Sequence, residues 1–363
     1  MKIAIVTLPL HSNYGGILQA YALQTILQKM GHDVLFVKYP QKNDFKLCMN
    51  NIVSPIINSI GRYTHHYTMR KILKEQNAKI STFRYKYLAK EISITELRSM
   101  ISKIDAIIVG SDQVWRHYNH LDIRFFYLDF LQDSNIKRIA YAASFGIKDW
   151  NFDTKTTASI SELANRFSAI SVREYDGLNI CSKYLGVNAV QVLDPTLLLG
   201  IEEYKKLFNK TYMAKISLST YIITPSTLKD EIISSVEQEL DTIAKPLSRM
   251  ENNPRCVDIK SKSSVEKWLA HLMGSEMLIT DSFHGTVFAI NFNVPFIIMQ
   301  NQEAGNSRLF NVLEKFNLQN RMVTSCEQAI RMIKEPINWN SVNKILLDEK
   351  EKSIAFIQNA LVN

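Results

Sequence analysis

The chain has 363 residues, 46% of them apolar and 21% charged, which is the composition of a folded protein large enough for two domains. Its net charge of +8 comes from scattered basic residues without a zinc-finger or RNA-binding signature, which argues against nucleic acid as a partner. The four cysteines have no metal-ligand spacing and no apolar run approaches a membrane span, so we expect a cytoplasmic protein without a metal site or disulfide framework.

Short apolar segments alternate with helical segments in both halves of the chain. The predicted strands are Lys2–Leu8, Asp33–Tyr39, Asp105–Val109, Arg138–Ala143, Ala169–Val172, Ala189–Leu193, Ser219–Thr224, Met277–Thr280 and Pro295–Met299. Several are apolar throughout, as strands of a parallel sheet buried on both faces are. The alternation predicts an α/β fold with doubly wound sheets.

Helices are expected between and after these strands. The predicted helices are Ile17–Met30, Thr154–Arg166, Glu174–Tyr184, Leu228–Leu240, Val265–Met273, Leu309–Phe316, Glu327–Lys334 and Asn340–Leu361. Gly31 follows the first of them as a helix C-terminal glycine does. Ser263 and Glu266 have capping-box spacing.

The predicted elements divide into two Rossmann-like domains. Residues 1–200 form the first domain and residues 201–340 the second, and a C-terminal helix over 341–363 is expected to pack back on the first. Residues 45–100 are Tyr-rich, Lys/Arg-rich and helical without a clear strand, so we interpret them as an insertion that faces an acceptor.

A glycine-containing segment links the first strand to the first helix. It consists of Asn13, Tyr14, Gly15 and Gly16. Such a turn lets the backbone approach a ligand, and the helix N-terminus offers free N–H groups to an anion or a sugar oxygen. A plain tight turn is the alternative. The spacing is not that of a dinucleotide-binding loop.

Polar residues also follow two buried strands of the first half. Asp112 comes after the strand that ends in Gly110, and Trp115 follows it closely. Ligands of open α/β sheets bind at the carboxyl ends of strands, so Asp112 could accept a proton from a sugar hydroxyl and Trp115 could stack on the sugar. A helix cap and a core tryptophan are the alternatives. Arg173 follows the next such strand and could bind a phosphate or carboxylate, or form an ion pair with Glu174 or Asp176.

Two further segments in the second half carry candidate groups. Ser282, His284 and Gly285 lie where a strand ends and a helix begins, and a histidine there can act as a general acid. Arg308 opens a later helix and could reach an anion in a cleft between the domains, although a surface arginine would have the same pattern.

Together these segments resemble the polysaccharide pyruvyltransferase family. The resemblance rests on the ordered set NYGGILQAYALQ, VGSDQVW, SVRE, LDPTLLL, TDSFHG and SRL, which spans residues 13–309. It implies two Rossmann-like domains facing a cleft, similar to the GT-B glycosyltransferase architecture. It also implies transfer of pyruvate from phosphoenolpyruvate to a hexose of a bacterial surface polysaccharide or its lipid-linked precursor, as a cyclic ketal, at the inner membrane face.

The resemblance also assigns roles to residues. The family's donor-site arginine falls on Arg173 and its proposed catalytic histidine on His284. Better-studied members carry Arg-Leu-His where this chain has Ser-Phe-His, so a serine at 282 replaces one donor arginine, and we expect Arg308 to supply that charge. We expect Ser282 and Gly285 on the donor side as well.

We expect the acceptor to be bound by the residues at the first glycine turn and after the third predicted strand, which are Asn13, Tyr14, Gly15, Gly16, Asp112 and Trp115. His284 would protonate the donor, and Asp112 or Asp281 would take the hydroxyl protons. This chemistry needs no redox cofactor and no obligatory metal. Two alternatives remain: a nucleotide-sugar glycosyltransferase, and a glycan-binding protein of the same fold without catalysis.

Overall fold

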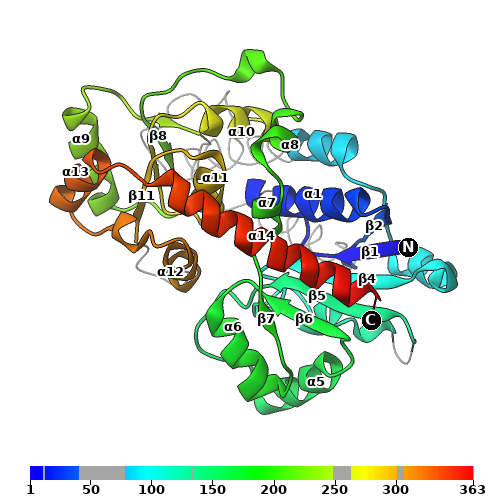
Figure 1. The fold of residues 1–363 in the computed structure, drawn as a ribbon. Coiled ribbons are helices and arrows are strands. Elements are labelled where there is room, and N and C mark those ends of the chain that lie inside the picture. The colour runs from blue at the N-terminus through cyan, green and yellow to red at the C-terminus, as the bar shows by residue number, and fades with distance from the viewer. Residues whose placement is uncertain (11–12, 41–77, 132–133, 248–262, 301–305, 363) are drawn as a thin grey trace, which may run out of the picture.

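The computed structural model describes residues 1–10, 13–40, 78–131, 134–247, 263–300 and 306–362. The fold contains two parallel sheets, which occupy different parts of the molecule (Figure 1). The first sheet has the strand order β3-β2-β1-β4-β5-β6-β7. Its strands are β1 (Lys2–Val6), β2 (Asp33–Val37), β3 (Glu91–Ile92), β4 (Ala106–Asp112), β5 (Lys137–Ala143), β6 (Ala169–Val172) and β7 (Val190–Gln191).

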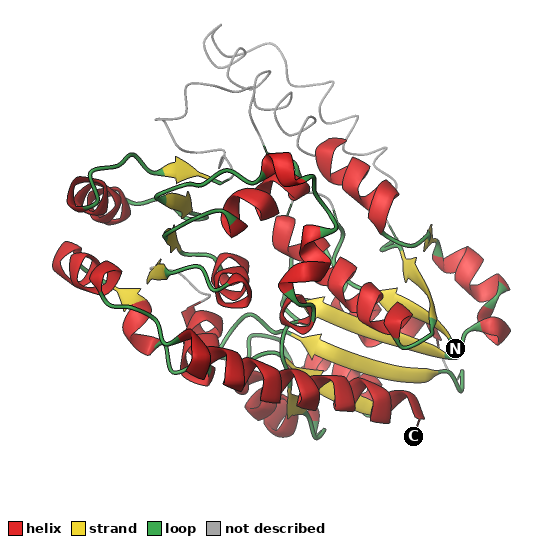
Figure 2. Ribbon diagram, turned by 45° about the horizontal axis from the view of Figure 1, so that its top comes forward, coloured by secondary structure: helices red, strands yellow, loops and turns green. Residues whose placement is uncertain are grey.

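The second sheet has the order β12-β11-β10-β8-β9. It consists of β8 (Ser219–Tyr221), β9 (Lys245–Pro246), β10 (Leu278–Thr280), β11 (Phe296–Met299) and β12 (Met322–Val323). Each registered strand pair of both sheets is parallel. The arrows of the first sheet point toward the second sheet, so their carboxyl ends meet the second half of the chain (Figure 2).

Helices cover these sheets and fill the space between them. They are α1 (Tyr14–Lys29), a helix over 78–87, α4 (Ile94–Ser99), α5 (Thr154–Ala164), α6 (Tyr175–Ile180), α7 (Pro195–Leu198), α8 (Ile201–Lys205), α9 (Thr227–Glu239), α10 (Val265–Met273), α11 (Phe283–Phe292), α12 (Asn306–Lys315), α13 (Cys326–Lys334) and α14 (Trp339–Val362). Among the described residues, none of these helices combines the length and apolar composition that a bilayer crossing requires.

The predicted parallel α/β fold is confirmed, with local differences. Each predicted strand is present: β6 has the predicted bounds, and the others begin or end up to three residues away from the prediction. The strands β3, β9 and β12 were missed because each is only two residues long. β3 lies inside the stretch where no strand was expected, and much of the rest of that stretch is outside the described residues. The predicted capping serine was wrong by one position, since Ser264 caps α10 by accepting a hydrogen bond from the Lys267 N–H.

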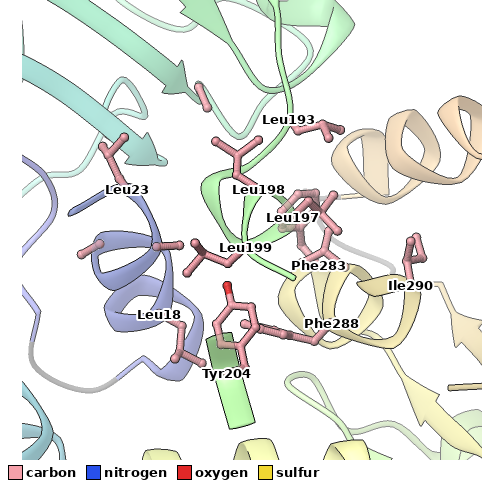
Figure 3. Close-up of a cluster of buried hydrophobic side chains, with 14 of the residues drawn as sticks. Leu18, Leu23, Leu193, Leu197, Leu198, Leu199, Tyr204, Phe283, Phe288 and Ile290 are labelled. Carbon is pink, nitrogen blue, oxygen red and sulfur yellow. The ribbon is translucent and has the colours of Figure 1, made fainter. Parts of the chain in front are cut away.

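A continuous hydrophobic core joins the two sheets. Its side chains come from α1, the segment between β7 and α8, α8 itself and α11, and they point toward one another (Figure 3). Tyr204 and Phe288 are buried there with their ring centroids 5.1 Å apart. Asn291 of α11 donates hydrogen bonds to the carbonyl oxygens of Thr196 and Leu199. The site between the sheets therefore rests on packed helices from both halves.

The C-terminal helix α14 runs from the second sheet back across the first (Figure 1). The Leu193 N–H donates to Ser353 Oγ of this helix, and Lys137 Nζ of β5 donates to the Leu361 carbonyl oxygen. The first sheet ends at Gln191 and the second begins at Ser219, on either side of the domain boundary that we placed near residue 200. That boundary stays a prediction.

Candidate active site

A buried arginine lies at the centre of the candidate site. Arg173 follows β6, and its side chain is 3% exposed. Its Nη1 lies 2.6 Å from Asp194 Oδ2, its Nη2 lies 3.5 Å from Asp112 Oδ1, and its Nε lies 4.0 Å from Glu174 Oε2. A buried charge needs such partners: Asp194 holds the guanidinium by a hydrogen bond, and Asp112 and Glu174 lie at ion-pair distance.

Asp194 is fixed from its other side by the helix that it begins. Its Oδ1 accepts hydrogen bonds from the N–H and the hydroxyl of Thr196 at the start of α7. Burial acts to raise the pKa of Asp194, but the charge of Arg173 and the Thr196 bonds outweigh it and hold this pKa below its ordinary value. Asp194 is therefore a stable anion that anchors Arg173.

His284 enters the site from the second half of the chain, on the first turn of α11. Its ring is 8% exposed, and its Nε2 lies 4.0 Å from Asp194 Oδ2. The ring packs on Gly15 of α1 so closely that a Cβ at residue 15 would lie 2.0 Å from His284 Nδ1. Burial, with the charges of Arg173 and Arg308, lowers the pKa of His284 against the opposing effect of the nearby carboxylates. The imidazole is therefore neutral at pH 7 in the free protein.

A second arginine approaches from α12. The guanidinium carbon of Arg308 lies 5.8 Å from the centroid of the Phe283 ring, and that of Arg173 lies 4.3 Å from the same centroid. Burial and the like charge of Arg173 lower the pKa of Arg308 to about 10, so it remains a cation at neutral pH. Phe283 thus carries two guanidinium groups over its ring.

Several buried polar atoms of this cluster have no hydrogen-bond partner among the described residues. They are Arg173 Nε and Nη2, Glu174 Oε2, His284 Nε2 and Arg308 Nε. Arg173, Glu174, Phe283 and Arg308 also line a cavity of about 20 Å³. Native proteins satisfy nearly all buried polar groups, so a concentration of unsatisfied groups indicates a place for a ligand. The cluster offers cationic donors to an anion and one carboxylate oxygen to a hydroxyl.

The profile of one protein family, "Polysaccharide pyruvyl transferase", matches residues 13–303. The chain belongs to this family. No curated protein matches it. The match begins at the glycine turn and includes each candidate site residue except Arg308. The family resemblance in the sequence is thereby confirmed, and it makes the protein a transferase.

Solved structures support the fold of this family member. The Arabidopsis thaliana protein UGT89C1 in complex with quercetin is 9% identical, with 100% of this chain and 99% of that chain covered and a TM-score of 0.55. The same protein with UDP-L-rhamnose is 9% identical, with coverages of 98% and 97% and a TM-score of 0.52. A UDP-N-acetylglucosamine 2-epimerase from Rickettsia bellii is 12% identical, with coverages of 99% and 97% and a TM-score of 0.47. At 9% identity the likeness to the two UGT89C1 structures shows the GT-B type of fold alone.

The structure brings most of the predicted site residues together. Asp112 ends β4 and Arg173 follows β6, which is separated from β4 by β5 in the first sheet, and His284 and Arg308 reach them from the second half. A Cβ at Gly16 would lie 3.5 Å from Asp112 Oδ2, which places this turn beside the same cluster. Asn13 caps α1 by accepting a hydrogen bond from the Gly15 N–H.

Ser282 and Gly285 hold the histidine turn in place. Ser282 Oγ accepts a hydrogen bond from the Gly285 N–H and caps α11. A Cβ at Gly285 would lie 2.6 Å from Thr280 Oγ1, so the turn packs tightly against the end of β10. Through these contacts Ser282 and Gly285 position His284.

Two of the predicted acceptor residues lie in the core instead. Trp115 is fully buried, stacks on Tyr127 at 4.9 Å and donates from Nε1 to the Phe126 carbonyl oxygen. Neither of its ring faces is free for a sugar. Tyr14 is also buried, where it stacks on Trp268 at 5.6 Å. These aromatic residues pack inside because their large apolar area is worth more buried than exposed at a cleft.

Sequence reasoning did not place Glu174 and Asp194 in the site. Glu174 Oε1 accepts hydrogen bonds from Ser144 Oγ and the Phe145 N–H, which fixes the carboxylate beside Arg173. The signal was present, because both acids follow apolar strand segments. Asp281, considered as a base, bonds to Lys229 Nζ and to backbone N–H groups of the β8–α9 turn. Among the described residues no cluster of metal-binding side chains occurs.

Proposed function

We propose that this protein transfers pyruvate from phosphoenolpyruvate to a hexose of a bacterial surface polysaccharide or its lipid-linked precursor, forming a cyclic ketal. One observation carries the proposal: Arg173, Arg308 and His284 converge between the sheets with buried polar atoms that lack partners. Phosphoenolpyruvate carries a phosphate and a carboxylate, and two guanidinium groups in a partly desolvated site suit these anions. Family membership supports the pyruvyl group as the cargo.

His284 is the proposed acid. It gives a proton to the methylene carbon of phosphoenolpyruvate, and the adjacent carbon becomes cation-like. A sugar hydroxyl oxygen then bonds to that carbon, the bond to the phosphate oxygen breaks, and a second hydroxyl closes the ketal. Of the two hydroxyl protons released, one restores His284, and the other passes through Asp112 to the departing phosphate. Acid catalysis of this kind contributes about 10²–10⁴-fold in rate.

The protonation state of His284 fits a cycle in which the donor binds first. In the free protein, burial and two arginines keep its pKa low and the ring neutral. An anionic donor bound beside the ring adds negative charge, which favours the protonated form of the imidazole. The imidazole then takes up a proton next to the donor and is ready to deliver it. Asp112, beside Arg173 and the glycine turn, is the proposed acceptor of a hydroxyl proton.

The donor needs more room than the described cavity provides. About 20 Å³ is space for one water molecule, so side chains shift when the donor enters. Arg308 has freedom to do so, because it is partly exposed and bridges to no carboxylate within the described part of the chain. The glycine turn, which packs on the His284 ring and lies beside Asp112, is the proposed place for the acceptor sugar. We place the reaction in the cytoplasm, with peripheral contact at the inner membrane face.

The test is donor binding and phosphate release with purified protein. Phosphoenolpyruvate and a uridine diphosphate sugar are titrated in parallel, followed by phosphate release with a hexose-containing acceptor. We expect the wild-type protein to bind phosphoenolpyruvate and Arg308→Gln to bind it more weakly. His284→Gln should abolish phosphate release. Arg173→Ala should abolish phosphoenolpyruvate binding, and its folding has to be verified separately. Binding of the nucleotide sugar alone would replace the proposal by a glycosyltransferase, and sugar binding without phosphate release would indicate a glycan-binding protein.

A further inference from the structure

Next to the site, the side chains of Gln113, Arg116 and Tyr118 are joined by hydrogen bonds. The proposed mechanism does not use this group, which we call the Gln113 cluster. Gln113 Oε1 accepts a hydrogen bond from Arg116 Nη1 at 2.8 Å and from the Tyr118 hydroxyl at 3.4 Å. The amide itself packs on Gly146, where a Cβ would lie 2.6 Å from Gln113 Oε1 and where φ is +67°. A side chain at 146 would therefore displace the amide that orients Arg116 and Tyr118.

Arg116 keeps its positive charge available. Within the described part of the chain, no carboxylate lies within ion-pairing distance of its guanidinium, whose one printed bond goes to a neutral amide. The guanidinium carbon lies 5.7 Å from the centroid of the Tyr118 ring. Both side chains are partly exposed, so a ligand can reach them. An oriented arginine without a carboxylate partner is suited to binding an anion.

The Gln113 cluster borders the candidate active site, because Gln113 directly follows Asp112, whose carboxylate lies 3.5 Å from Arg173. The charge of Arg116 is among those that lower the pKa of Arg308. Burial, and then the charge of Asp112, raises the pKa of Tyr118 to about 12, while Arg173 and Arg308 act in the opposite direction. Tyr118 thus lies within reach of the charges on Asp112, Arg173 and Arg308, and its hydroxyl stays protonated and able to donate a hydrogen bond at neutral pH.

The charge balance of the site calls for a further cation. Two guanidinium groups face three carboxylates, those of Asp112, Glu174 and Asp194, and His284 is neutral in the free protein. A donor with a phosphate and a carboxylate would add several negative charges to a cluster that is already net negative. Ser282 contributes only a helix cap. Binding such a donor is favourable only if additional positive charge faces it.

We infer that Arg116, held by Gln113, binds the phosphate group of the phosphoenol donor, with the Tyr118 hydroxyl as a second hydrogen-bond donor to the same phosphate. This inference rests on the proposed function for the identity of the donor. Arg173 and Arg308 then serve the donor carboxylate and the bridging oxygen beside His284. Arg116 and Tyr118 determine specificity for a donor that carries phosphate.

The experiment measures binding of three ligands by titration calorimetry: phosphoenolpyruvate, inorganic phosphate and pyruvate. The variants are Arg116→Gln, Arg116→Lys, and Arg98→Gln as a control. Arg98 is exposed on α4 and carries the same charge, so the control has the same change of net charge. Melting temperatures verify that each variant folds. Loss of one charge-assisted contact should weaken phosphoenolpyruvate and phosphate binding about 10- to 100-fold in Arg116→Gln.

The expected pattern is selective. Arg116→Gln weakens the two phosphate ligands and leaves pyruvate binding unchanged, Arg116→Lys restores part of the affinity, and Arg98→Gln resembles wild type. Wild-type phosphate binding in Arg116→Gln, equal weakening of pyruvate, or no phosphate binding by the wild type would each overturn the inference. If phosphate binds in an Arg116-dependent way but phosphoenolpyruvate does not bind, the anion site stands and the proposed function fails. If Arg116→Gln releases phosphate at the wild-type rate and binds phosphoenolpyruvate with wild-type affinity, the proposed function stands and the inference is refuted.

Discussion

The contact between Gly15 and His284 allows a sharp test of the site. In Gly15→Ala the new methyl carbon would lie 2.0 Å from His284 Nδ1, 2.1 Å from Cγ and 2.6 Å from Cε1. The ring would have to retreat by roughly 1.4 Å to reach ordinary contact at 3.4 Å. A displacement of about 1 Å at a reacting group can reduce turnover about 100-fold. We therefore expect a loss of at least that size in kcat, with the fold intact because a side chain, not backbone, has to move.

Gly16→Ala is the matched control for this substitution. Its methyl group would lie 3.5 Å from Asp112 Oδ2, an ordinary contact, so His284 should stay where it is. Both glycines lie in the first turn of α1, and alanine in either adds helix propensity of up to about 1 kcal/mol. The assays are phosphate release, thermal melting and the NMR shift and titration of the His284 ring. A Gly15→Ala protein with wild-type turnover and an unshifted His284 signal would refute the geometry described here.

Three further predictions concern stability. Asp194→Asn leaves Arg173 with two carboxylates, and we expect the free energy of unfolding, measured in urea, to fall by about 3 kcal/mol. The control is Asp129→Asn, in the partly exposed ion pair with Arg124, which should lower it by less than about 1 kcal/mol. Trp115→Ala should cost about 3–5 kcal/mol of stability because the ring is fully buried, and a variant that instead lost only acceptor affinity would return Trp115 to the site. For His284, the folded pKa lies below the ordinary 6.5, so the unfolded chain binds more protons just below that pH and stability falls on acidification through this window. In His284→Gln the free energy of unfolding should therefore fall less on acidification than in the wild type. Parallel curves of stability against pH for the two proteins between about pH 5 and 7 would contradict a lowered pKa of His284.

The sequence alone predicted the order of the main elements. Fully apolar segments such as the one before Gly110 are typical of strands buried on both faces of a parallel sheet, and the helical segments between them indicated the α/β class. The polar residues after these strands, Asp112, Arg173 and His284, were identified because a parallel sheet places the carboxyl ends of its strands at one edge. That rule is local, so one chain suffices to apply it.

Only the tertiary structure decided which of these residues share a site and in what state. Trp115 and Asp112 are three positions apart, yet one lies in the core and the other beside Arg173, because packing against Tyr127 depends on residues distant in the sequence. Asp112 and Asp194, which lie beside Arg173 with its neighbour Glu174, come from distant segments of the chain, so only the fold shows how this cation is paired. Likewise a glycine at position 15 has a role only because α11 brings His284 against it. Sequence determines local geometry and burial tendency, whereas electrostatics and steric fit arise from contacts that only the folded chain creates.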